Sequence, residues 1–125
     1  MPQNIFPPTL FSLIFLALPI LIYSFVLLDR LIQAEYESHK AAWEADGKPM
    51  GFFFFPPGQN WLDKFRGGWA RNRISFVWLF KTPSWVSASI EYRVWLRRFR
   101  ICVLVWNLWF LLVVAFVFLL WTAQA

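Results

Sequence analysis

Apolar residues fill both ends of this chain, and charged residues are confined to its middle. No Asp, Glu, Lys or Arg occurs before Asp29 or after Arg100. A helix needs about 20 apolar residues to cross the hydrocarbon core of a bilayer, and residues 9–28 and 101–121 each supply such a stretch. Because unpaired backbone groups are costly in hydrocarbon, both stretches should be helical. The pattern predicts an all-α integral membrane protein, a two-transmembrane-helix hairpin in which residues 1–125 form a single domain.

The central segment, residues 29–100, is predicted to extend both spanning helices beyond the membrane. The first helix should continue to Ala45, because Ile32, Tyr36, His39 and Trp43 recur on one helical face. The run Asp46-Gly47-Lys48-Pro49 predicts its end, since glycine accepts the left-handed conformation and proline cannot continue a helix.

The second long helix is predicted to run unbroken from Thr82-Pro83, a favourable helix start, to Trp121. Residues 61–80 combine basic and apolar side chains, and Gly67-Gly68 predicts a break there. We therefore expect a broken helix at the membrane interface rather than a third span.

Aromatic residues are unusually abundant, with 15 Phe, 9 Trp and 3 Tyr. Four consecutive Phe precede Pro56-Pro57-Gly58, and an exposed run of this kind marks a membrane or partner contact. The alternative is that the run folds back onto the protein's own helices. A heptad-like aromatic seam before and inside the second span should face another helix, first of all the extended first helix. The residues expected to contact partners or lipid are Phe52, Phe53, Phe54, Phe55, Trp85, Tyr92, Trp95, Phe99 and Asn107.

Charge sets the expected orientation. All 12 Lys and Arg lie in the central segment, and basic residues stay on the cytoplasmic side of bacterial inner membranes. This predicts a multi-pass inner-membrane protein with a cytoplasmic centre and two periplasmic termini. The same rule explains the net charge of +5 without a nucleic-acid partner. Anionic lipid headgroups should contact the basic residues before the second span, which are Arg93, Arg97, Arg98 and Arg100.

Candidate chemistry is sparse. The sequence has no phosphate loop, metal-ligand motif or nucleophile elbow, so we expect no enzyme activity, metal or cofactor. His39, the one histidine, is a weak candidate for an axial haem ligand, while hydrogen bonding or placement at the interface is the commoner role. Asn107 is the one amide in either span and should bond a neighbouring helix.

Two runs carry a family resemblance. Residues 39–49, His-Lys-Ala-Ala-Trp-Glu-Ala-Asp-Gly-Lys-Pro, follow a charge-free anchor, and residues 92–100, Tyr-Arg-Val-Trp-Leu-Arg-Arg-Phe-Arg, lead into the C-terminal span. In this layout the chain resembles the small two-span bacterial membrane proteins related to universal stress protein B. The Phe run and the density of Trp depart from that group. The resemblance implies a bacterial inner membrane and no defined biochemical activity.

These features favour a non-catalytic accessory or structural subunit of a larger membrane complex, possibly a bioenergetic one, because the aromatic surface exceeds what two helices can bury. Two alternatives stay open. The chain could be a membrane scaffold that associates with copies of itself, or a small regulator of a transporter or a stress response.

Overall fold

The computed structural model describes residues 8–124, and all regular structure in that range is helical. The elements are α1 (Pro8–Ser38), α2 (Lys40–Ala45), α3 (Trp61–Phe80), the 3-10 helix η1 (Ser84–Ala88) and α4 (Ile90–Ala123). The all-helical fold class predicted from the sequence is therefore confirmed.

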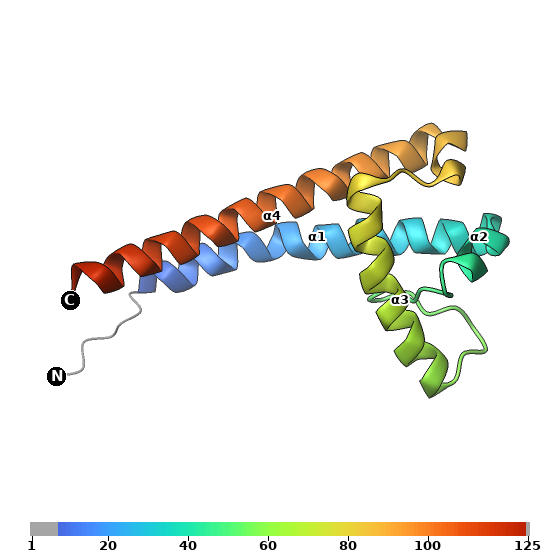
Figure 1. The fold of residues 1–125 in the computed structure, drawn as a ribbon, viewed down its shortest axis with the longest axis horizontal. Coiled ribbons are helices and arrows are strands. Elements are labelled where there is room, and N and C mark those ends of the chain that lie inside the picture. Colours follow the sequence, from blue (N-terminus) through green and yellow to red (C-terminus); the bar gives the residue numbers. More distant parts are fainter. Residues whose placement is uncertain (1–7, 125) are drawn as a thin grey trace.

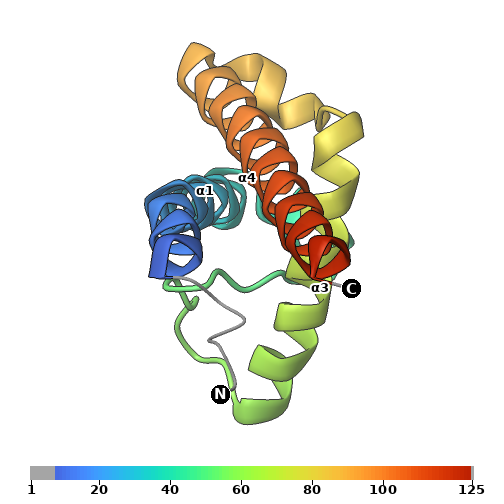
Figure 2. The ribbon, with the colours of Figure 1, turned by 90° about the vertical axis from the view of Figure 1, so that its left-hand side faces the viewer.

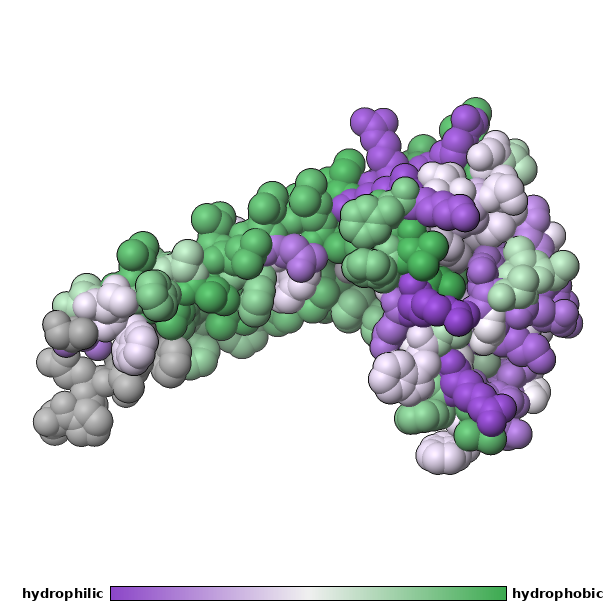
Figure 3. All heavy atoms as spheres, in the orientation of Figure 1, coloured by the Kyte–Doolittle hydropathy of each residue, from purple (hydrophilic) through white to green (hydrophobic). Residues whose placement is uncertain are grey.

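Helices α1 and α4 lie side by side in opposite directions and form a long rod (Figure 1). Each is long and apolar enough to cross a membrane. The core helix of a soluble protein would be mostly buried, whereas only 22% of the apolar stretch of α1 and 0% of that of α4 are buried. The apolar half of the rod is hydrophobic over most of the surface in view, and hydrophilic side chains gather at the other end, which we call the head (Figure 3). Two exposed apolar helices of this kind are compatible with a membrane location.

Helix α3 crosses the rod at the point where its apolar half meets the head (Figures 1 and 2). It is one continuous helix of 20 residues, so the break predicted at Gly67-Gly68 is wrong. Gly67 instead lets the preceding loop approach closely, because its carbonyl accepts a 3.0 Å hydrogen bond from Met50 N and a Cβ at this position would collide with the Met50 side chain. Asn60 begins α3 through reciprocal hydrogen bonds with Asp63.

The predicted ends of the long helices are partly correct. The stop after Ala45 is confirmed, with Gly47 at a φ of +89°. The continuous first helix up to that stop is wrong, because α1 ends at Ser38 and His39, at φ −137° and ψ 53°, separates it from α2. The unbroken helix from Thr82 is wrong, since Pro83 is extended and α4 begins at Ile90. The intervening 3-10 helix places Trp85 in the core. Neighbouring residues in the sequence do not indicate this packing, so the sequence could not predict the break.

The core lies where α1, α3, η1 and α4 meet, which is in the head and not in the apolar half of the rod. Its most buried members are large and apolar, and they include Leu27, Leu31, Ile32, Trp78, Trp85, Val86, Leu96 and Phe99. Complete burial of a large apolar side chain contributes about 1.5–3 kcal/mol. This cluster therefore fixes the head on the end of the rod.

Candidate docking surface

Asp29 anchors the Phe run to the end of the first apolar stretch. Its carboxylate accepts hydrogen bonds from the backbone N–H groups of Phe52 (2.7 Å), Phe53 (2.7 Å) and Phe54 (3.0 Å), while its own side chain is buried. Hydrogen bonds to a charged acceptor are about twice as strong as neutral ones. Gly51 makes the approach possible, because a Cβ at that position would lie 2.7 Å from Asp29 Oδ1. The loop is therefore fixed by its backbone, which leaves the four rings free to point in different directions.

The four rings alternate between the protein and its surroundings. Phe52 stacks on Phe25 of α1 at 3.9 Å between ring centroids, and Phe54 packs against the core. Phe53 and Phe55 point outward, with 65% and 49% of their surfaces exposed. The chain bends at Phe52 and Phe53, and Gly51 N–H donates to Phe54 O at 2.9 Å, so the alternation of the rings follows from a turn and not from an extended strand. Phe52 and Phe54 therefore fold back onto the protein, whereas Phe53 and Phe55 are available to lipid or a partner.

Arg71 ties α3 to the same loop. Its guanidinium donates to Gly51 O at 3.1 Å and lies 3.9 Å above the Phe52 ring. Burial lowers the pKa of Arg71, and the negative charge of Asp29 acts in the opposite direction. The charge of Asp29 thus helps to hold the half-buried guanidinium of Arg71, which joins α1, the Phe loop and α3 in one unit.

Arg100 makes the corresponding attachment on α4. Its Nε donates to Trp78 O at 2.8 Å, and its Nη2 donates to Thr82 Oγ1 at 3.1 Å. Asp29 and Arg100 are the charged residues nearest to the two apolar stretches. They hold α3 across the rod at the level where those stretches end.

This attachment leaves one side of α3 covered and another bare. Gly67, Ala70, Ile74 and Trp78 are buried against the rest of the protein. The exposed apolar side chains of α3 are Trp61, Leu62, Phe65, Trp69, Phe76, Val77 and Phe80. Figure 3 shows hydrophobic and hydrophilic side chains next to one another on the part of this helix that is in view. We call this bare side, together with Phe53 and Phe55, the aromatic surface.

A second feature of the head is a buried acid beside an open cavity. Glu35 is fully buried and accepts a 2.9 Å hydrogen bond at Oε2 from the indole of Trp85, while its Oε1 is buried without a donor. Burial, reinforced by the neighbouring Asp46 carboxyl, raises the pKa of Glu35 to about 9. Glu35 is therefore protonated at neutral pH.

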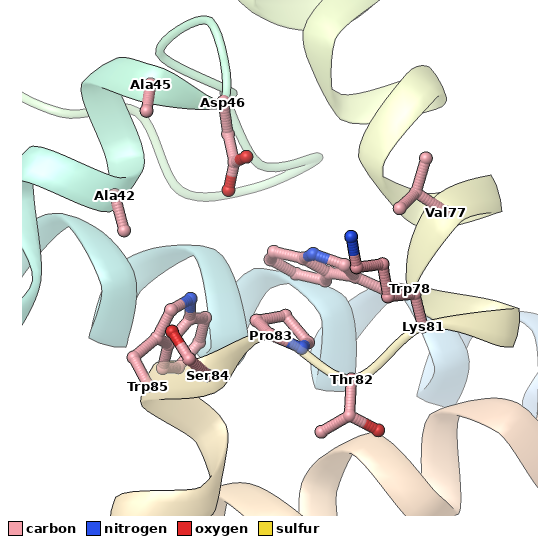
Figure 4. Close-up of a pocket in the computed structure, with 10 residues that line it drawn as sticks. All are labelled: Ala42, Ala45, Asp46, Val77, Trp78, Lys81, Thr82, Pro83, Ser84 and Trp85. Carbon is pink, nitrogen blue, oxygen red and sulfur yellow. The ribbon is translucent and has the colours of Figure 1, made fainter.

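The cavity next to this pair measures about 490 Å³ and opens between α2, the end of α3 and η1. The side chains of Asp46, Trp78, Lys81 and Trp85 are among those that line it (Figure 4).

The other predicted contact residues lie in three settings. Trp85 and Phe99 are buried, and Tyr92 and Trp95 pack against the core, so this part of the seam faces the protein's own α1. Arg93, Arg97 and Arg98 are exposed in the first turns of α4, where Arg98 also reaches the Tyr23 hydroxyl at 3.3 Å.

Asn107 does not bond α1, since its amide donates to Val103 O of its own helix at 2.7 Å. The bond that joins the two helices in this region comes instead from Trp109, whose indole donates to Leu13 O at 2.8 Å.

His39 stacks on Trp85 with a centroid separation of 5.3 Å and lies at the junction of α1 and α2. Within residues 8–124 no group of three or more His, Cys, Asp or Glu side chains is placed to hold a metal ion. The structure gives His39 this stacking contact, and its role as an axial haem ligand stays a prediction.

Sequence reasoning missed Asp29, Glu35 and Arg71. Asp29 carried a usable signal, because an acid directly after an apolar span must find either water or donors. Glu35 and Arg71 carried none, since their partners are 50 and 20 residues away in the chain.

Comparison with known proteins adds no assignment: no family model, no curated protein and no solved structure matches this chain.

Proposed function

We propose that this protein is a non-catalytic accessory or structural subunit of a larger integral membrane assembly. The observation that carries the proposal is the aromatic surface, where Trp61, Trp69 and Phe80 are 78%, 67% and 77% exposed. Monomeric soluble proteins rarely expose contiguous apolar patches of this kind, and such patches mark interaction sites. The attachments at Asp29 and Arg100 keep this surface rigidly oriented relative to the rod, as docking requires.

The membrane setting is part of the proposal. The 12 Lys and Arg all lie between the two apolar stretches, which favours a cytoplasmic head and periplasmic termini in a bacterial inner membrane. The resemblance to the group related to universal stress protein B supports the same compartment. A reporter that is active only in the cytoplasm, fused after Ala125, should give no signal, and a strong signal would overturn this orientation.

The docking role is tested by native mass measurement after mild detergent extraction from the source membrane. The unchanged chain should be recovered with unrelated, larger membrane subunits. Changing Phe65 and Trp69 to Ser should release those subunits, because both rings are exposed and their loss leaves the core intact. Arg66→Ser, which alters an exposed residue in the same turn, is the matched control and should retain them.

Two results would contradict the accessory role. Recovery of the chain only in multiples of itself would favour a scaffold, and recovery of the single chain would contradict both the accessory role and the scaffold. Retention of the same larger subunits by the double variant would show that the aromatic surface does not hold them, and that lipid covers it instead.

A further inference from the structure

Asn107 presents an incompletely bonded amide on the outer side of an apolar helix. It lies six residues after Ile101, or roughly 9 Å along the axis at 1.5 Å per residue, and is therefore inside the proposed span. Its side chain is exposed, and its recorded hydrogen bond is the one from Nδ2 to Val103 O. An Asn side chain has two N–H donors and a carbonyl acceptor. One N–H and the carbonyl oxygen therefore lack a partner in the part of the chain that the structure describes.

Hydrocarbon cannot satisfy these groups. An amide inside a membrane span is usually bonded to a neighbouring helix, which contributes about 0.6–2 kcal/mol. The neighbour is not α1, because α1 packs on the other side of α4, where the Trp109 indole reaches Leu13 O. Figure 2 shows α1 along one side of α4 in the view from the apolar end of the rod. The outer side of α4 is therefore free to receive another helix.

A stripe of exposed residues passes through Asn107 at alternating spacings of three and four. Its members are Leu104, Asn107, Leu111, Val114 and Phe118, and all five are exposed. This spacing is that of the a and d positions of a coiled coil. A single Asn among apolar residues at such positions specifies the register and number of helices that associate.

We propose that α4 forms a parallel homodimer through this stripe, with the two Asn107 amides bonded to each other. The partner is a second copy because the unused groups of Asn107, one donor and one acceptor, complement the same groups on an identical side chain. A two-fold axis places each residue opposite its own copy, and Asn107 then meets Asn107 at one depth. All copies insert with one topology, so their α4 helices run parallel. The inference rests on the membrane setting of the proposed function but not on its larger partner.

Disulfide cross-linking in vesicles tests the proposal. The purified chain, with Cys102 changed to Ser, is placed in phospholipid vesicles that contain no other protein. Leu111→Cys lies on the stripe, and Leu112→Cys is the matched control, since the two leucines are adjacent and 61% and 64% exposed. We expect Leu111→Cys to form dimers at least about fivefold faster than Leu112→Cys under mild oxidation, because only the former faces its copy.

The second part of the cross-linking test uses Asn107→Leu. Adding it to Leu111→Cys should lower the cross-linked fraction by about fivefold to thirtyfold, the equivalent of 1–2 kcal/mol for the lost amide pair. The substitution makes the span more apolar, so it does not act by preventing insertion. Vesicle flotation checks the membrane setting separately, because failure of all variants to float would contradict the proposed spans themselves.

Three outcomes overturn the homodimer: equal cross-linking at the two leucines, none at either, or an unchanged fraction with Asn107→Leu. Cross-linking of Leu111→Cys only to another protein in the native membrane would also overturn it and assign the stripe to a different partner. The mass measurement on the aromatic surface is independent of these results.

Discussion

The two ends of the rod organise the same kinds of residue in opposite ways. In the apolar half, α1 and α4 keep most side chains exposed and share the bond from Trp109 to Leu13. The head instead has a core in which aromatic residues such as Trp78, Trp85 and Phe99 are buried. Buried acids position its parts, as Asp29 does for the Phe loop and Glu35 does for Trp85. In the membrane setting that we propose, this difference has a physical reason: lipid covers the exposed side chains of the spans, whereas the head lies in water or among headgroups and needs a core of its own.

This contrast predicts that removing a polar group lowers stability more in the head than in the spans. The largest effect should follow Asp29→Ala, which removes the acceptor of three partly buried backbone N–H groups. An unsatisfied buried group costs about 1–3 kcal/mol, so the head should lose roughly 3 kcal/mol or more. Limited proteolysis should cleave the loop of residues 51–60 rapidly in this variant. Glu37→Ala, which removes an exposed acceptor on the same helix, should leave cleavage unchanged, and equal protection in both variants would contradict the anchoring role of Asp29.

The second prediction separates the two pairs of rings in the Phe run. Phe52→Ala should lower the free energy of unfolding in detergent by roughly 2–4 kcal/mol, because this ring stacks on Phe25 and under Arg71. Phe53→Ala should change it by no more than about 0.5 kcal/mol, since that ring is exposed. Comparable losses would mean that the outward ring is also packed in the protein.

The third prediction concerns pH. The pKa of Glu35 is raised from 4.5 to about 9 in the folded protein, so folding favours its protonated form. The resulting contribution to the free energy of unfolding is complete below pH 4.5. It is lost as the pH rises towards 9, at no more than about 1.4 kcal/mol per pH unit. Thermal unfolding of the unchanged protein should therefore shift to lower temperature from pH 5 to pH 9. Glu35→Gln keeps an acceptor for Trp85 and should flatten this dependence, and an equally steep profile in the variant would assign it to other groups.

The smallest effect is expected in the rod. Trp109→Phe keeps the aromatic volume but removes the hydrogen bond to Leu13 O, a change of about 0.6–2 kcal/mol in a membrane span. Cross-linking between cysteines placed on α1 and α4 should decrease only slightly. A loss as large as that of Asp29→Ala would show that the apolar half depends on polar contacts as much as the head does.

The sequence alone determined the all-helical class, the two long apolar helices and the stop at Gly47, because each follows from local composition or backbone preference. It also determined that a run of four Phe must leave some rings uncovered.

The tertiary structure decided which rings those are, through the attachment of the loop to Asp29. It also decided that α3 continues through Gly67 and that α4 starts at Ile90, since both depend on packing against distant segments. The tertiary structure also decided that Asn107 faces away from α1. Periodicity places a residue on a helical face, but only the position of the neighbouring helix decides whether that face is covered or bare.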